Sequence, residues 1–348
     1  MKETLYHRFT GYDELTDLLS GSDEDALAAL DHKPALICIT GSEGQGRARF
    51  VSCLLHGNED SGYRAVLDML RRKDTYPFDL WVFIGNVRAA CQEGWFAHRY
   101  QDDQEDFNRV WGLGHPTTRM RRCADAVLAE LGTISGLEAA VDLHNNTGDN
   151  PPYAVLPVWS DACLGLAALC ADTAMVWGLK ANALMEVLSD RCPVVAVECG
   201  MIGLASSTAF AMGVLERFLA ADLRGLRTSP ERPLFIWEMN HRVTVRPEVS
   251  FGFGGMLSDC VDLVLAPGLD ATNFGLLPRG TIIGHAHCGA AMPLMAMSMQ
   301  GQDDTERCFA LQDDGSIVVS RDLTPAMMTT TVAQARRDCL FYLARRRA

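Results

Sequence analysis

Two segments of the sequence carry histidine or carboxylate side chains directly after short apolar runs. His56 and Glu59 follow the run 50–55, and His144 follows the run 139–143. Imidazole and carboxylate groups bind catalytic zinc, which normally takes three protein ligands and one water. A histidine and a glutamate three residues apart also occur in ordinary surface turns, so it is the second histidine that favours a metal. The sequence therefore predicts one zinc ion per chain, held by His56, Glu59 and His144.

Two further carboxylates lie in similar apolar surroundings. Asp142 shares a strand face with His144, because alternate residues of a strand point to the same side, and we expect it to hold the imidazole in place. Glu198 follows the apolar run 194–197. A buried carboxylate is costly unless it is paired or has a function, and the alternative here is a salt bridge at the end of a strand. Near a metal ion, Glu198 would act as a general base toward water and then as an acid toward the leaving group.

Four other polar residues are candidates for contacts with a substrate. Arginine grips a carboxylate with two parallel hydrogen bonds, so Arg109 with Asn108 suits a substrate carboxylate. Arg88 would stabilise the negative charge that develops on an attacked carbonyl oxygen. Taken alone, each arginine fits an ordinary surface charge better. Asn145, which begins a polar loop after His144, is expected to line the pocket and contact the substrate.

The apolar runs and the segments between them predict the elements that position these side chains. Short apolar runs are typical of buried strands, and longer amphipathic segments are typical of helices. The expected strands cover residues 35–40, 50–55, 80–84, 139–143 and 194–197, and the expected helices cover residues 62–72, 117–131, 161–178 and 207–221. Strands that alternate with helices form an α/β fold. Ligands bind at the carboxyl ends of the strands of such sheets, so we expect the site residues to meet there.

The pattern of the sequence changes after residue 229. Short β-like runs separated by glycine and proline follow, at 235–237, 242–245, 263–265 and 317–319. This pattern is typical of a small β-rich module. We therefore expect a catalytic domain over residues 1–229 and a β-rich C-terminal domain over residues 230–348.

The composition argues against several classes of function. The chain has 348 residues and a formal net charge of −13, whereas nucleic acid binding needs a concentrated basic surface. No apolar run approaches the roughly 20 residues of a membrane-spanning helix. The polar N-terminal segment lacks the apolar stretch of a secretion signal.

The 12 cysteines form no C-x-x-C pair and are scattered along the chain. Most of them lie among apolar or small residues, where buried reduced thiols are usual. Examples are Cys38, Cys53, Cys170, Cys199 and Cys288. The cysteines therefore favour the reducing cytoplasm.

Five short motifs occur in an order that resembles the aspartoacylase and succinylglutamate desuccinylase family, a branch of the zinc-carboxypeptidase clan. They are H-G-N-E (56–59), N-x-R-A (86–89), D-x-N-R (106–109), D-L-H (142–144) and V-E-x-G (197–200). The resemblance covers about residues 35–220. It implies a mixed, mostly parallel sheet flanked by helices, with a smaller β-rich C-terminal domain.

The resemblance also implies roles for individual residues. His56, Glu59 and His144 would be the zinc ligands, Arg88 the group that polarises the carbonyl, Asn108 and Arg109 the substrate anchors, and Glu198 the catalytic carboxylate. One position departs from the family, because Leu188 stands where aspartoacylases have a further arginine. We therefore expect a substrate whose amino acid is neutral or cationic.

These patterns together predict an amidohydrolase that cleaves the linear amide bond of a small N-acylated amino acid. A carboxypeptidase-like enzyme that acts on short peptides is the first alternative. The second is a non-catalytic binding protein with the same fold, for which we would expect a zinc ligand or the base to be missing. Which acyl group and amino acid are bound, whether the chain forms a homo-oligomer, and what His285 and His287 do stay open at this point.

Overall fold

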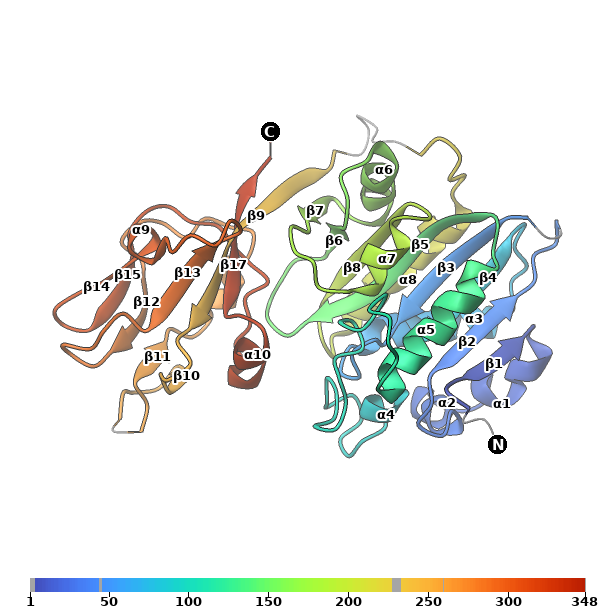
Figure 1. Cartoon of the computed structure of the whole chain (residues 1–348), viewed down its shortest axis with the longest axis horizontal. Coiled ribbons are helices and arrows are strands. Elements are labelled where there is room, and N and C mark those ends of the chain that lie inside the picture. The colour runs from blue at the N-terminus through green and yellow to red at the C-terminus, as the bar shows by residue number, and fades with distance from the viewer. Residues whose placement is uncertain (1–3, 44–45, 227–232, 259, 348) are drawn as a thin grey trace. The chain divides into compact units, whose positions relative to one another are not determined.

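The computed structural model describes residues 4–43, 46–226, 233–258 and 260–347. The chain divides into two compact units (Figure 1). The first unit comprises Met1–Asn145, Pro152–Ala174 and Lys180–Leu234, and the second comprises Asn146–Pro151, Met175–Leu179 and Phe235–Ala348. The predicted domain boundary at residues 229 and 230 lies outside the described residues.

The first unit is built on a mixed, mostly parallel sheet, as predicted. Its strands follow the order β1-β2-β4-β3-β5-β8-β6-β7. β3 pairs in parallel with both β4 and β5, whereas β2 is antiparallel to β4 and β6 is antiparallel to β8. The strands are β1 (His7–Thr10), β2 (Ala35–Ile39), β3 (Ala48–Cys53), β4 (Asp79–Ile84), β5 (Leu137–Asn146), β6 (Tyr153–Leu156), β7 (Thr173–Val176) and β8 (Val194–Met201).

Helices flank this sheet and bury their apolar side chains against it. In Figure 1, α5 crosses in front of the sheet, while α3 and α8 pack against each other. The helices are α1 (Thr16–Leu19), α2 (Asp23–Ala29), α3 (Asp60–Arg72), α4 (Val87–Ala90), α5 (Arg119–Gly132), α6 (Asp161–Cys170), α7 (Leu184–Leu188) and α8 (Ala205–Ala220), and a 3-10 turn covers Asp13–Leu15. Thr118 caps the N-terminus of α5 by accepting a hydrogen bond from the backbone of Arg121.

One predicted helix is wrong in its second half. The segment 161–178 contains α6 only as far as Cys170, and β7 then begins at Thr173. The run is apolar almost throughout, so its pattern does not separate a buried helix from a buried strand. Ala171 is already extended, with φ of −151° and ψ of 162°, and the β-branched Thr173 and Val176 favour a strand.

The second unit is rich in β-strands, as predicted. A sheet of five strands has the order β10-β11-β12-β15-β14. These strands are β10 (Phe251–Phe253), β11 (Leu263–Leu265), β12 (Ile282–Ala286), β15 (Ser316–Val319) and β14 (Phe309–Leu311). The long strand β9 (Phe235–Val245) pairs antiparallel with β13 (Leu294–Ser298) and with β17 (Phe341–Arg346), and β17 pairs with β16 (Pro325–Ala326).

Short helices and one apolar core complete the second unit. The helices are α9 (Thr305–Cys308) and α10 (Val332–Arg337), and a 3-10 turn covers Leu269–Thr272. The buried side chains of both sheets form one cluster, which includes Val243, Leu263, Leu294, Ile317 and Phe341. β9 joins two of the predicted short strands, 235–237 and 242–245, into one.

All 12 cysteines are free thiols. Cys38, Cys53, Cys170 and Cys199 are buried, as predicted, whereas Cys288 is exposed, so the prediction for Cys288 is wrong. Cys288 follows β12 beside Gly289, which has a φ of 78°, and a turn of this kind leaves its side chains in solvent.

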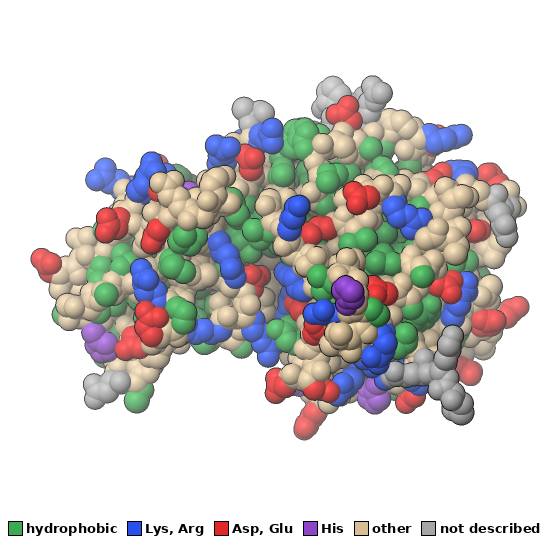
Figure 2. Space-filling model, in the orientation of Figure 1, with side chains coloured by type: hydrophobic (Ala, Val, Ile, Leu, Met, Phe, Trp, Pro, Cys, Tyr) green, Lys and Arg blue, Asp and Glu red, His purple; other side chains and the backbone are tan. Residues whose placement is uncertain are grey.

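Acidic and basic side chains are interspersed among the described residues on the face shown in Figure 2. That face therefore lacks the continuous basic surface that nucleic acid binding needs. Within the described residues, no helix combines the length and the apolar character that a membrane span requires.

Candidate metal centre and active site

The turn after β3 brings the first histidine to the site. Leu54 has a φ of 58°, a left-handed conformation that is uncommon for a residue with a bulky side chain. Its carbonyl oxygen accepts a hydrogen bond of 2.6 Å from the backbone N–H of Asn86. Strained backbone of this kind is often found at functional sites, where the surrounding structure holds it.

Gly57 separates His56 from the next ligand, and the space around it admits no side chain. A Cβ atom at this position would lie 2.6 Å from the Cβ of Ala89 and 2.7 Å from the carbonyl oxygen of His98. The backbone N–H of Gly57 donates a hydrogen bond of 2.8 Å to the carbonyl oxygen of Arg99. The glycine of the H-G-N-E motif is thus required by close packing against α4 and the loop that follows it.

The structure brings His56, Glu59 and His144 together. The Nδ1 atom of His56 lies 2.7 Å from one carboxylate oxygen of Glu59, and Nδ1 of His144 lies 2.7 Å from the other. One potential ligand atom from each of the three residues lies within 4.8 Å of the others. All three side chains are buried. Two imidazoles and a carboxylate at this spacing fit the ligand set of a catalytic zinc ion.

A second carboxylate lies behind each imidazole. Nε2 of His56 lies 2.9 Å from Asp106, and Nε2 of His144 lies 2.8 Å from Asp142. The predicted contact between Asp142 and His144 is therefore confirmed. Metal-binding histidines are commonly oriented in this way, since a carboxylate on one nitrogen leaves the other free to bind the metal.

The electrostatics of the group also fit a cation. Burial opposes the ionisation of Glu59, but the charges of His56 and His144 outweigh it and hold the pKa of Glu59 well below its usual range. Burial likewise opposes the protonation of His144, but Asp142 and Glu59 outweigh it and raise the pKa of His144 well above its ordinary value. The carboxylates of Asp142 and Glu59 thus favour a positive charge at His144. A divalent cation bound between the three side chains would supply that charge in place of the proton on the imidazole.

Glu198 lies within β8, opposite Tyr153 in the register of β6 and β8. Loss of hydration raises the pKa of Glu198 to about 7, and the negative charge of Glu59 adds to this shift, while His144 opposes it. The charges of all three metal-ligand candidates, His56, Glu59 and His144, act on the pKa of Glu198. A carboxyl group with a pKa near neutrality can both accept and donate a proton.

Arg99 contacts this group, although no sequence pattern indicated it. Its guanidinium lies 2.7 Å from Nε2 of His56 and donates a hydrogen bond of 3.3 Å to Glu59. It also donates a hydrogen bond of 3.3 Å to Asp106. Arg99 belongs to a loop without periodicity, so only the three-dimensional contact identifies it. It provides a positive charge directly beside the metal-ligand candidates.

Asn108 and Arg109 lie next to the same group. The side-chain nitrogen of Asn108 is 3.4 Å from Nε2 of His144, and its side-chain oxygen accepts a hydrogen bond of 3.0 Å from the backbone of Leu184. Arg109 is partly buried and donates a hydrogen bond of 2.8 Å to the carbonyl oxygen of Asn108. The positive charge of Arg109 also contributes to the lowered pKa of Asp106.

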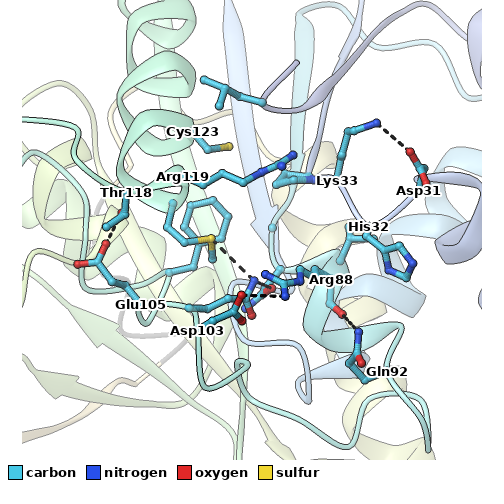
Figure 3. Close-up of a pocket in the computed structure, with 18 residues that line it drawn as sticks. Asp31, His32, Lys33, Arg88, Gln92, Asp103, Glu105, Thr118, Arg119 and Cys123 are labelled. Carbon is cyan, nitrogen blue, oxygen red and sulfur yellow. Dashed lines mark hydrogen bonds and ion pairs between the residues drawn. The ribbon is translucent and has the colours of Figure 1, made fainter. Parts of the chain in front are cut away.

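Two other predicted site residues have different surroundings. Arg88 is exposed and forms an ion pair of 2.9 Å with Asp103. Arg88 also lines a pocket (Figure 3) whose lining includes none of the three metal-ligand candidates, and its role toward a substrate stays a prediction. Asn145 donates hydrogen bonds of 3.0 Å to the side chain of Ser61 and to the carbonyl oxygen of Gly200. These bonds tie the end of β5 to α3 and β8, and the predicted contact of Asn145 with a substrate stays a prediction.

Comparison with solved structures identifies the fold of the chain, whereas comparison of sequences does not. No sequence-family model matches the chain, and a search of curated proteins finds no match. The chain has the zinc-carboxypeptidase-like fold of succinylglutamate desuccinylases and aspartoacylases, so the resemblance seen in the sequence is confirmed at the level of the fold.

Three solved structures illustrate the likeness. The succinylglutamate desuccinylase from Vibrio parahaemolyticus has a TM-score of 0.58 and 14% identity, covering 94% of this chain and 96% of that one. The succinylglutamate desuccinylase from Chromobacterium violaceum has a TM-score of 0.53 and 17% identity, covering 87% of this chain and 85% of that one. Murine aminoacylase 3 has a TM-score of 0.51 and 16% identity, covering 87% of this chain and 96% of that one.

Proposed function

We propose that this protein is a zinc-dependent hydrolase that cleaves the amide bond of a small N-acylated amino acid. The observation that carries the proposal is the buried group of His56, Glu59 and His144, with a second carboxylate behind each imidazole. The names of the similar structures, a desuccinylase and an aminoacylase, support an acyl–amino acid amide as the substrate.

The residues around this group supply the remaining parts of the chemistry. When bound, zinc would act as a Lewis acid and lower the pKa of water, so that the attacking hydroxide forms near neutral pH. The carboxylate of Glu198 would accept the proton of the attacking water and pass it to the nitrogen of the departing amine. The pKa of Glu198 is about 7 in the metal-free protein, and the positive charge of bound zinc would lower it, which favours the carboxylate form that accepts the proton.

Arg88 remains the proposed group that stabilises the developing oxyanion, and Arg99 is a second candidate for this role. The guanidinium of Arg99 contacts Glu59 and His56, whereas that of Arg88 contacts Asp103. Asn108 and Arg109 remain the proposed anchors of the substrate carboxylate, because both lie beside His144 and Asp106. Asn145 holds the end of β5 in place for them.

Amine release from a panel of N-acetyl and N-succinyl amino acids and dipeptides tests the proposal. Release from one class of acyl-amino acid by the zinc-loaded protein would establish the reaction. Release from dipeptides alone would favour the carboxypeptidase-like alternative, and no release despite bound zinc would favour a non-catalytic binding protein. The free thiols support the further proposal that the protein works in the reducing cytoplasm.

A further inference from the structure

A buried serine lies one step behind the metal-ligand candidates. Ser52 belongs to β3, in which every residue is buried, and it is only 1% exposed. Its neighbours in the strand, Val51 and Cys53, are 0% exposed. A hydroxyl group in such surroundings is costly unless it forms a hydrogen bond. The partner of Ser52 therefore indicates what the polar side chain does in this strand.

That partner is the carboxylate behind His144. Ser52 in β3 stands opposite Asp142 in β5, because the two strands are parallel neighbours (Figure 1). The hydroxyl of Ser52 donates a hydrogen bond of 2.7 Å to Oδ1 of Asp142. The other carboxylate oxygen, Oδ2, lies 2.8 Å from Nε2 of His144. Asp142 thus has one oxygen bound to the serine and the other bound to the imidazole.

The same series of contacts continues to the centre of the group. Nδ1 of His144, the second nitrogen of its ring, lies 2.7 Å from Glu59. Ser52, Asp142, His144 and Glu59 are therefore joined by consecutive hydrogen bonds that begin inside the sheet. None of the four is more than 3% exposed, and hydrogen bonds are stronger in such buried surroundings than in water.

The carboxylate behind His56 is held by different groups. Asp106 accepts a hydrogen bond of 2.9 Å from a backbone N–H and one of 3.3 Å from the guanidinium of Arg99. Asp142 accepts its hydrogen bond from the neutral hydroxyl of Ser52 instead. Loss of this hydroxyl would therefore act on one side of the metal centre and leave the side of His56 in place.

The two bonds of Asp142 fix both its orientation and that of the imidazole. An aspartate side chain can rotate about its torsion angles, and a hydrogen bond on each oxygen restricts that rotation. An ionised carboxylate only accepts hydrogen bonds, so Nε2 of His144 carries the proton in this contact. Nδ1 is then the nitrogen that faces Glu59 and would take a metal ion.

We propose that Ser52 is a positioning residue of the metal centre and that it acts through Asp142. Its hydroxyl holds the carboxylate of Asp142 in the orientation that directs Nδ1 of His144 toward Glu59. This role rests on the proposed zinc centre, but it does not depend on hydrolysis, because it concerns how tightly the metal ion is held.

The zinc affinity of the full-length protein, measured by competition with a chromophoric chelator, tests the proposal. Ser52→Ala is expected to weaken zinc binding about three- to tenfold, which is less than the loss typical of a carboxylate that contacts the histidine directly. Ser52→Thr keeps the hydroxyl and should restore most of the affinity.

A double-mutant cycle with Asp142→Ala separates an action through Asp142 from a general loss of packing. Residues that act through one another give effects that do not add. In the Asp142→Ala background, Ser52→Ala should therefore change the zinc affinity by less than about twofold. A purely structural role would give the same loss in both backgrounds.

Ser207→Ala is the matched control, because it also removes the hydroxyl of a buried serine. Ser207 is 3% exposed and donates a hydrogen bond of 2.8 Å to the carbonyl oxygen of Met201. Neither residue is a metal-ligand candidate. The zinc affinity of this variant should equal that of the wild type.

Circular dichroism would establish that each variant is folded before the titration. If Ser52→Ala does not fold, Ser52→Thr and Ser52→Val take its place, since the two side chains have the same shape and only threonine has a hydroxyl. The threonine variant should then bind zinc more tightly than the valine variant.

Three results would overturn the proposal. They are an unchanged zinc affinity in Ser52→Ala, an equal loss in Ser207→Ala, and a loss that is undiminished in the Asp142→Ala background. Zinc binding that follows the expected pattern without amine release would support the role of Ser52 and contradict the proposed hydrolysis. A wild type that binds no zinc would overturn both.

Discussion

The backbone N–H of Gly57 donates a 2.8 Å hydrogen bond to the carbonyl oxygen of Arg99. The loop that carries the guanidinium is therefore fastened directly to the H-G-N-E turn that carries His56 and Glu59. This link explains how a cation from a loop without regular structure is held against the buried metal-ligand candidates.

Replacing Gly57 by alanine is expected to destabilise the protein and weaken metal binding. The new Cβ would lie 2.6 Å from the Cβ of Ala89 and 2.6 Å from the backbone nitrogen of Ala90. Overpacking of this kind costs about 1–3 kcal/mol. Urea unfolding would measure the change. Gly132→Ala is the matched control, because a Cβ there meets nothing within 4 Å, and equal losses in both variants would contradict the account.

Replacing Asp142 by asparagine should reduce the affinity for zinc about 10- to 100-fold, as is typical when a carboxylate behind a metal-binding histidine is changed. Asp142 lies 2.8 Å from Nε2 of His144, on the side away from Glu59. Competition with a chelator of known affinity would give the dissociation constant. An unchanged zinc affinity would show that this contact does not orient a metal ligand.

Arg99 and Arg88 can be compared directly. If Arg99 stabilises the oxyanion, Arg99→Gln should lower kcat/KM by about 100-fold or more. If Arg88 instead stays paired with Asp103 during turnover, Arg88→Gln should lower it by less than about threefold. Steady-state rates on the best substrate of the panel would decide. A larger loss in the Arg88 variant would support the role that the sequence predicts for it.

The raised pKa of Glu198 predicts that stability depends on pH in the metal-free protein. The pKa rises from 4.5 to about 7 on folding, so the native state binds this proton more tightly than the unfolded chain. That stabilisation is present below pH 4.5 and is lost as the pH rises through 7. Glu198→Gln, which mimics the protonated form, should therefore stabilise the protein by about 1–3 kcal/mol at pH 8 and very little at pH 4.

Urea unfolding in the presence of EDTA at the two pH values would measure this difference. Glu248→Gln serves as a control, because Glu248 is exposed and the substitution should change stability little at either pH. A stabilisation by Glu198→Gln that is equal at both pH values would contradict the assignment.

The expected side-chain specificity rests on Leu188. It is 1% exposed in α7 and stands where the similar family has an arginine. We expect faster turnover of N-acylated amino acids with neutral or cationic side chains than of N-acetylaspartate. Comparison of kcat/KM for N-acetylleucine, N-acetyllysine and N-acetylaspartate is the test, and a preference for N-acetylaspartate would contradict the expectation.

The strands of the first unit could be predicted because they are short, apolar and bounded by polar turns. β2, β3 and β4 lie within two residues of the expected runs. The ends of β5 and β8 could not be predicted in this way. A polar residue after an apolar run usually marks the end of a strand, so the predicted strands end before His144 and Glu198. Both residues lie inside their strands, and for His144 the partner that allows this is Asp142.

The three metal-ligand candidates could also be found in the sequence, because each stands out against apolar neighbours. Arg99 could not, since it contacts Glu59 from 40 residues away and nothing in its own segment distinguishes it from a surface arginine. For Arg88 the motif predicts chemistry and the structure shows an exposed ion pair, so its role stays a prediction. Long-range contacts of loop residues depend on the fold, and local patterns do not report them.

The most direct test measures zinc content and amine release together for the wild type, Glu59→Gln and Glu198→Gln. We expect about one zinc per chain and turnover in the wild type, and loss of both in Glu59→Gln. Glu198→Gln should keep its zinc and lose activity by about 100-fold or more. A Glu198→Gln variant that keeps both zinc and full activity, or a Glu59→Gln variant that remains active without zinc, would contradict the central claim.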